Sequence, residues 1–163
     1  MSIKLVRLDF RLIHGQVVTK WVKAVDATKI VIINDTLAND EFMANIYKMA
    51  APSNVKVEIY SIQAGISAFK ENQFGEQNTI LLFKSVEEVY LANKEGLIID
   101  ALQIGGLGGG AGRVNTSTGI SFDAKDVKLL REMKEFGSEI YIQVVPSQSR
   151  YDFEKVIEKY NFN

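Results

Sequence analysis

The chain of 163 residues contains no cysteine and only one histidine, His14. Without cysteine the protein forms no disulfide bond and offers neither a thiolate nucleophile nor a thiolate metal ligand. A single histidine likewise excludes a metal site built from several imidazole rings. These absences rule out thiol chemistry and draw attention to His14.

Long apolar runs are also missing, and none approaches the roughly 20 residues that a helix needs to cross a bilayer. The first residues, Met1 to Lys4, lack the apolar core of a signal peptide. Acidic and basic residues nearly cancel, at 20 and 19, which does not indicate nucleic-acid binding. No Walker A phosphate loop occurs anywhere in the chain. We therefore expect a cytoplasmic protein that makes no direct use of ATP.

The composition is that of an ordinary soluble globular protein, with 47% apolar and 24% charged residues. The length fits a single domain over residues 1–163 with a substantial core. No internal repeat and no linker-like stretch divides the sequence.

Strand-like and helix-like segments alternate along the chain. Continuous apolar runs such as Ile30 to Ile33 are typical of strands covered on both faces, whereas the alternation over residues 55–60 indicates an edge strand. Strands are predicted over residues 3–9, 29–34, 55–61, 79–83, 101–104 and 140–145. Amphipathic helices are predicted over residues 16–25, 42–50, 129–136 and 153–160, with a further helix after Ser85.

Two helix boundaries carry sequence signals. Ser85 and Glu88 have the spacing of a capping box, and Gly137 is suited to closing the helix that precedes it. Residues 105–119, in contrast, resemble a long irregular insertion. The alternation as a whole predicts an α/β fold with an open, mostly parallel twisted sheet and helices on both faces.

Ligands in such sheets bind beyond the carboxyl ends of the strands, and His14 follows the first predicted strand at such an end. It also precedes a helix, whose first backbone N–H groups have no intrahelical partner and favour an anion. Gly15, Gln16 and Val17 would supply these amides to a phosphate. His14 is therefore either a structural histidine that caps a turn or a nucleophile for phosphoryl transfer.

Three charged residues accompany His14, and two of them have a plain structural alternative. Arg11 presents a planar fork of donors that suits phosphate, but it also fits a solvated surface arginine. Asp9 could hold Arg11 or one ring nitrogen of His14 and so fix the tautomer, or it could be an ordinary aspartate at a strand end. Arg7 shares the strand face of Asp9 and is a weaker candidate behind it.

The glycine-rich stretch from Gly105 to Gly112 matches the dinucleotide fingerprint only formally. A polar segment from Arg113 follows it, where the fingerprint requires a helix. We therefore do not expect nucleotide binding there, and a mobile loop beside the His14 crevice is the better interpretation.

Residues 7–17 read Arg-Leu-Asp-Phe-Arg-Leu-Ile-His-Gly-Gln-Val. This segment closely resembles the histidine motif of IIB components in the mannose/fructose/sorbose family of the bacterial phosphoenolpyruvate-dependent sugar phosphotransferase system, which reads Arg-Ile-Asp-Asp-Arg-Leu-Ile-His-Gly-Gln-Val. The resemblance extends over nearly the whole chain, through Asn34-Asp35 with Asp40, Ala51-Pro52, and Gly105-Gly106 to Asp126.

The resemblance implies a phosphocarrier, which is a protein-phosphohistidine–sugar phosphotransferase component. His14 would accept a phosphoryl group on its Nδ1 (pros) nitrogen from the phosphohistidine of a IIA partner, in a separate chain or a fused one. It would then donate the group to a sugar held by membrane IIC and IID subunits, with which the protein would associate peripherally. Arg11 matches the family arginine that stabilises the phosphorylated state. No metal or organic cofactor is implied, because the energy arrives with the phosphoryl group.

The chain departs from the family motif at one position, where Phe10 replaces the second aspartate. Transfer between two folded proteins predicts a partner-facing rim around His14, for which Phe10, Ile13 and the loop after Gly105 are candidates. Steering charges for that rim are predicted at Lys20, Lys84 and Arg113. The alternative to a phosphocarrier is a regulatory or interaction protein that keeps the fold and senses sugar flux without onward transfer.

Overall fold

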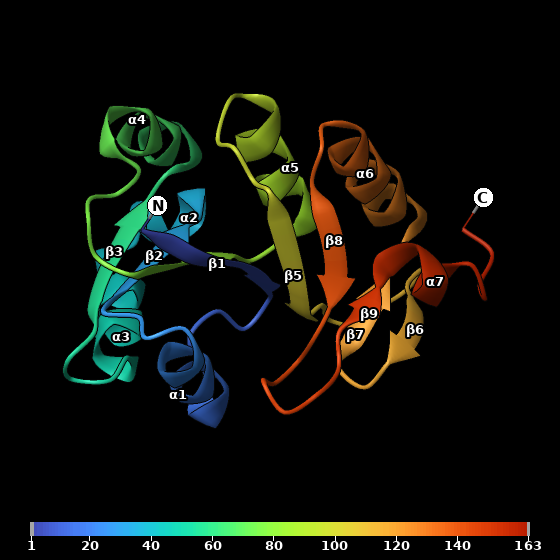
Figure 1. Ribbon diagram of the computed structural model, residues 1–163, viewed down its shortest axis with the longest axis horizontal. Helices are drawn as coiled ribbons and strands as arrows, with labels where there is room; N and C mark the ends of the chain where they lie inside the picture. The colour runs from blue at the N-terminus through green and yellow to red at the C-terminus, as the bar shows by residue number, and fades with distance from the viewer. Residues whose placement is uncertain (1, 163) are drawn as a thin grey trace.

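The computed structural model describes residues 2–162, except for the side chains of Gln16 and Val17. Its main feature is a seven-stranded sheet in the order β3-β2-β4-β1-β5-β8-β9 (Figure 1). The strands are β1 (Ile3–Asp9), β2 (Lys29–Ile33), β3 (Lys56–Tyr60), β4 (Thr79–Phe83), β5 (Ala101–Gly106), β8 (Glu139–Ile142) and β9 (Tyr151–Asp152). A separate two-stranded sheet consists of β6 (Val114–Ser117) and β7 (Ile120–Phe122).

All pairings in the large sheet are parallel except that of β8 with β9. The most apolar strands, β2 and β4, are buried along their whole length and lie inside the sheet. The alternating strand β3 lies at the edge, as predicted, with its residues only partly buried. The predicted strands are confirmed, with shifted ends: β5 continues to Gly106, and β8 ends at Ile142.

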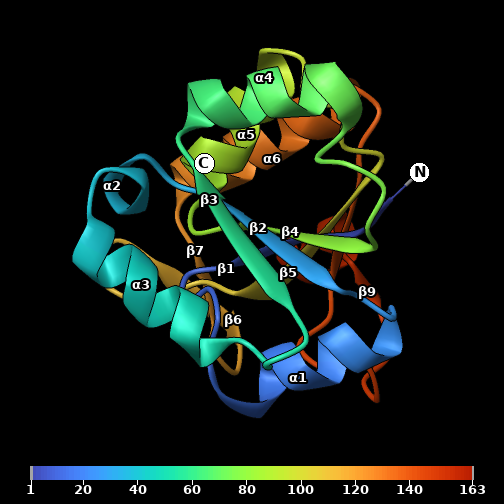
Figure 2. The same ribbon diagram turned by 90° about the vertical axis from the view of Figure 1, so that its left-hand side faces the viewer.

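Helices cover both faces of the sheet, as predicted. They are α1 (Gly15–Ala24), α2 (Asp35–Ala38), α3 (Glu41–Ala50), α4 (Ile62–Asn72), α5 (Val86–Lys94), α6 (Ala124–Glu135) and α7 (Phe153–Ile157). Figure 2 shows α1 and α3 below the sheet and α4, α5 and α6 above it. Each side has its own apolar cluster, with Trp21 of α1 in one and Leu130 of α6 in the other.

This arrangement makes the carboxyl end of β1 a topological switch point. Strand β1 lies between β4 and β5. The helix that follows β1 packs on one face of the sheet, whereas α5 and α6, which follow β4 and β5, pack on the other (Figure 2). Chain segments therefore diverge at the end of β1, which is where ligands of open α/β sheets commonly bind.

The prediction of an irregular insertion over residues 105–119 was wrong. Gly106 still belongs to β5, and β6 and β7 form a hairpin that begins at Val114. Gly119, with a φ of +75°, occupies a left-handed conformation between the two strands. The fully buried Phe122 of β7 packs against Phe153 at a ring separation of 5.7 Å, which ties the hairpin to the core.

The predicted capping box at Ser85 is only half formed. The Ser85 hydroxyl accepts a hydrogen bond from the backbone of Glu88 and so caps α5. The Glu88 carboxylate, however, accepts from the side chains of Asn34 and Ser85. Gly137 follows α6 with a φ of +105°, as expected for the residue after a helix end. No helix within residues 2–162 is long and apolar enough to span a membrane.

Candidate functional site

Strand β1 carries two buried charged side chains near its carboxyl end, which is the topological switch point. Arg7 and Asp9 lie two residues apart and therefore on the same face of the strand, and they are 3% and 0% exposed. The chain then turns, with the amide of Leu12 donating to the carbonyl of Asp9. Leu12 adopts a φ of +56° and is buried, which anchors the turn in the core beneath α1.

His14 ends this turn as the N-cap residue of α1, which begins at Gly15, one residue before the predicted start. Its extended backbone (φ −149°, ψ 134°) is usual for this position, but its side chain makes no capping hydrogen bond to the helix. The imidazole is therefore available for other contacts and does not serve as a helix cap.

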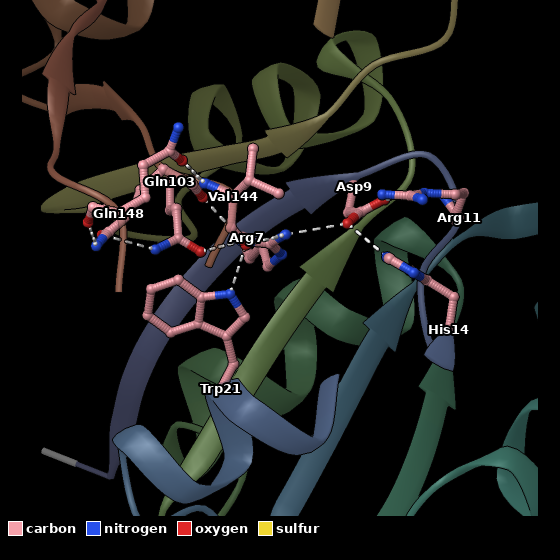
Figure 3. Close-up of polar contacts among 9 residues, drawn as sticks. Arg7, Asp9, Arg11, His14, Trp21, Gln103, Val144 and Gln148 are labelled. Carbon is pink, nitrogen blue, oxygen red and sulfur yellow. Dashed lines mark hydrogen bonds and ion pairs between the residues drawn. The ribbon is translucent and has the colours of Figure 1, made fainter. Parts of the chain in front are cut away.

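Asp9 is the centre of the site and contacts Arg7, Arg11 and His14 (Figure 3). Its Oδ2 atom lies 2.8 Å from His14 Nε2 and accepts from the Arg7 guanidinium at 3.1 Å. Its Oδ1 atom accepts from the backbone N–H of Arg11 at 3.0 Å and lies 3.6 Å from Arg11 Nε. Asp9 thus contacts both Arg11 and a ring nitrogen of His14, which an ordinary aspartate at a strand end would not do.

The contact with Asp9 determines which ring nitrogen of His14 carries the lone pair. An ionised carboxylate only accepts hydrogen bonds, so Nε2 is the donor in the neutral imidazole. Nδ1 then holds the lone pair. Because the His14 side chain is 19% exposed, the ring is still within reach of a reactant. The arrangement can present Nδ1 as a nucleophile and stabilise positive charge on the ring.

Arg7 contacts Asp9 and belongs to a buried polar network that fixes its position. Its guanidinium donates to the side chain of Gln103 and to the carbonyls of Gln143 and Val144. It also lies 5.5 Å from the centre of the Trp21 ring, whose N–H donates to the Val144 carbonyl. Burial lowers the pKa of Arg7, and the neighbouring Asp9 carboxylate acts in the opposite direction.

Two glycines of β5 make room for these buried charges. A Cβ atom on Gly105 would overlap the Arg7 guanidinium, and one on Gly106 would lie 2.9 Å from Asp9 Oδ1. The sequence reasoning missed this role and treated the glycines as the start of a loop. It also missed Gln103, although a polar residue inside an otherwise apolar strand is a usable signal of a buried partner.

The residues predicted for the partner-facing rim differ in exposure. Phe10 is 36% exposed, and Lys20 and Lys84 are also exposed. Ile13 is wrong as a rim residue, because it is buried in the apolar cluster under α1. Arg113 is wrong as a steering charge, because its guanidinium binds the Gly108 carbonyl and the carboxylates of Asp123 and Asp126 at the start of α6.

The remaining predicted positions belong to the first turn of α1 or to helix caps. Gly15, Gln16 and Val17 form the first turn of α1, although the side chains of the latter two lie outside the described part of the structure. Among the other residues of the resemblance, Asn34 and Asp40 accept hydrogen bonds from the first turns of α2 and α3.

The glycine-rich segment lacks the surroundings of a nucleotide site. Leu107 bridges to Ile120, and the chain continues into the hairpin without an intervening helix. Within the described residues, no three or more acidic, histidine or cysteine side chains gather as a metal-binding group.

Comparison with known proteins gives consistent matches over the chain. Residues 3–163 match the family model described as the PTS system sorbose subfamily IIB component. The sorbose-specific EIIB component of Klebsiella pneumoniae is 33% identical over 147 residues, which cover 90% of each chain.

Solved structures match equally well. The crystal structure of the IIBSor domain of the sorbose permease from Klebsiella pneumoniae superposes with a TM-score of 0.92 at 31% identity, over 100% of both chains. That of manxB from Thermoanaerobacter tengcongensis gives a TM-score of 0.91 at 39% identity, over 97% of this chain and 96% of the other.

Proposed function

Because this chain belongs to the sorbose subfamily of IIB components of the sugar phosphotransferase system, we propose that it is a phosphocarrier with His14 as the phosphorylated residue. The observation that carries the proposal is the hydrogen bond between His14 Nε2 and the buried Asp9 carboxylate, at 2.8 Å. It leaves Nδ1 with the lone pair at the carboxyl end of β1, so Nδ1 is the nitrogen that attacks phosphorus.

In the first step, Nδ1 attacks the phosphorus of a phosphohistidine on a IIA partner. The new Nδ1–P bond forms as the donor P–N bond breaks, and the electron pair of that bond returns to the donor imidazole. The His14 ring, which still carries the Nε2 proton, becomes positively charged. Asp9 stabilises this charge, as the carboxylate of a catalytic triad stabilises an imidazolium.

The phosphoryl oxygens need positive charge and N–H donors, because phosphoryl transfer depends on position and charge compensation. Arg11 supplies a guanidinium next to Asp9, and the first amides of α1, at Gly15, Gln16 and Val17, supply unpaired N–H groups. Arg7 keeps Asp9 in place and does not contact the phosphoryl group itself.

In the second step, a sugar hydroxyl oxygen attacks the phosphorus as the Nδ1–P bond breaks. The hydroxyl proton passes to water, and the electron pair of the broken bond returns the His14 ring to its neutral form. The sugar is held by the membrane subunits IIC and IID, which the protein reaches from the cytoplasm as a peripheral partner. No metal or organic cofactor takes part, because the phosphoryl group brings its own transfer potential.

Labelling by a phosphorylated IIA protein of the same family tests the proposal. Wild-type protein should take up one phosphoryl group, whereas His14→Ala and His14→Gln should take up none while remaining folded. Lys128→Ala, which changes an exposed residue of α6, is the matched control and should be labelled normally. Undiminished labelling of His14→Ala would refute the assignment of His14. If the label never passes to sugar in the presence of IIC and IID, the protein is a regulatory protein and not a phosphocarrier.

A further inference from the structure

Phe10 lies between the central carboxylate of the site and the glycine-rich loop. It directly follows Asp9, and its backbone N–H donates to the Gly106 carbonyl at 3.1 Å. Its ring rests against Gly108, where an added Cβ would lie 3.5 Å from the ring carbons Cδ2 and Cε2. The contacts with Gly106 and Gly108 therefore restrict the position of Phe10, although its side chain is 36% exposed.

The ring of Phe10 also supports the guanidinium of Arg11. Arg11 Cζ lies 5.5 Å from the ring centre, within the range in which an aromatic face attracts a cation. The same separation, 5.5 Å, joins Arg7 to the ring of Trp21. Each arginine of the site thus has an aromatic support in addition to the carboxylate of Asp9.

The Phe10 ring matters for Arg11 because the ion pair between Arg11 and Asp9 is weak. Its Nε atom lies 3.6 Å from Asp9 Oδ1, which is longer than a normal hydrogen bond, and its side chain is 45% exposed. A long, half-exposed side chain with one weak ion pair has many accessible rotamers. The ring restricts it to the region beside Asp9 and His14.

The type of side chain at position 10 determines how much of the positive charge of Arg11 remains available to a phosphoryl group. A carboxylate at position 10 would pair with the guanidinium and compete with the phosphoryl oxygens. An aliphatic side chain would exert no electrostatic attraction on it. An aromatic face attracts a cation through its quadrupole while carrying no net charge.

We propose that Phe10 is a positioning residue, whose ring holds the Arg11 guanidinium beside His14 without neutralising its charge. The proposal rests on the phosphocarrier function, because it assigns Arg11 to the phosphoryl group on His14. It makes position 10 a determinant of the stability of the phosphorylated form, apart from any contact with a partner protein.

The test uses phosphoramidate as the donor, so that docking of a protein partner cannot affect the result. Its phosphoryl group passes to His14 Nδ1 as the P–N bond breaks and ammonia leaves. Phe10→Leu removes the aromatic face and keeps the apolar bulk, and Phe10→Tyr retains the face. We expect Phe10→Leu to slow phosphorylation about two- to fivefold, the worth of an exposed cation–π contact, and Phe10→Tyr to restore the rate.

The same substitutions in an Arg11→Ala background show whether Phe10 acts through Arg11. There, Phe10→Leu should cause no further loss. An equal loss with and without Arg11, or no loss in either, would overturn the proposal. All variants should unfold at the wild-type temperature, which separates a change in the site from a change in the fold.

A readout that needs no phosphorylation distinguishes the failure of this inference from that of the proposed function. In the unphosphorylated protein, the Arg11 side-chain NMR signals should show a ring-current shift that Phe10→Leu removes and Phe10→Tyr retains. Absence of the shift in the wild type would refute the positioning role alone. A wild-type protein with the shift that takes no phosphoryl group from IIA would instead refute the phosphocarrier function.

Discussion

Replacement of Asp9 by asparagine should damage both the stability of the domain and the chemistry of His14. Asp9 is fully buried and serves three donors within hydrogen-bond distance, which belong to Arg7, Arg11 and His14. Asparagine keeps the shape of the side chain but removes its charge and converts one oxygen into an NH2 group. In either orientation the NH2 group faces another hydrogen-bond donor and leaves it without an acceptor. At the Oδ1 position this donor is the Arg11 backbone N–H, and at the Oδ2 position the donors are Arg7 and His14.

The expected loss of stability follows from the burial of Arg7. Removing one partner of a buried ion pair costs about 3–5 kcal/mol, because the other charge is left uncompensated. Arg7 keeps its hydrogen bonds to Gln103 and to the carbonyls of Gln143 and Val144. We therefore expect a loss at or just below the lower limit of that range, about 2–3 kcal/mol in the free energy of unfolding.

The expected loss of activity follows from the charge that forms on the ring. Without the carboxylate, the phosphorylated imidazole loses a charge-assisted hydrogen bond of about 1.5–3 kcal/mol, equivalent to about 10- to 150-fold in the transfer rate. Urea unfolding and transfer from phosphorylated IIA measure the two effects. Asp100→Asn, at an exposed aspartate just before β5, is the control and should change neither. Wild-type transfer by Asp9→Asn would refute the role of the carboxylate.

Three further changes test separate parts of the structure. Arg11→Ala should slow transfer from IIA about 10- to 150-fold, with partial recovery in Arg11→Lys because an ammonium lacks the planar fork; an unaltered rate would make Arg11 a surface residue. Gly105→Ala should lower the free energy of unfolding by about 1–3 kcal/mol, because its Cβ overlaps Arg7. Gly108→Ala, whose Cβ would make ordinary contacts, is its control in the same urea experiment. Burial raises the pKa of Glu88 above its ordinary value of 4.5, so the wild type should lose stability relative to Glu88→Gln as the pH rises from 4.5 through the raised pKa. Urea unfolding at several pH values checks the sign, and a constant difference would contradict it.

The parallel sheet was predictable because its strands have simple patterns. The apolar runs of β2 and β4 reflect burial on both faces, and the alternation in β3 reflects a partly buried edge strand. Helix α4 was missed even though Ile62, Ile66 and Phe69 have helical spacing and Ser61 caps them. The hairpin could not be predicted in the same way, because the short strand β6 is polar and mostly exposed.

For the candidate site, the sequence predicted which residues lie close together but not the contacts among them. Proximity in sequence brings Asp9, Arg11 and His14 together, but no pattern states which ring nitrogen Asp9 binds. That choice depends on the turn at Leu12 and on the direction in which α1 leaves the strand. The support of Arg7 by Gln103 spans 96 positions in the sequence, so only the pairing of β1 with β5 reveals it.

The position of the phosphoryl group on His14 is the most direct test of the central claim. Because the chain has one histidine, the ring nitrogens of the 15N-labelled phosphoprotein give a single, unambiguous set of NMR signals. We expect the coupling between 31P and 15N to identify Nδ1 as the phosphorylated nitrogen, with Nε2 still protonated and bound to Asp9. Phosphorus on Nε2 would contradict the arrangement, since that nitrogen would have to leave the carboxylate 2.8 Å away.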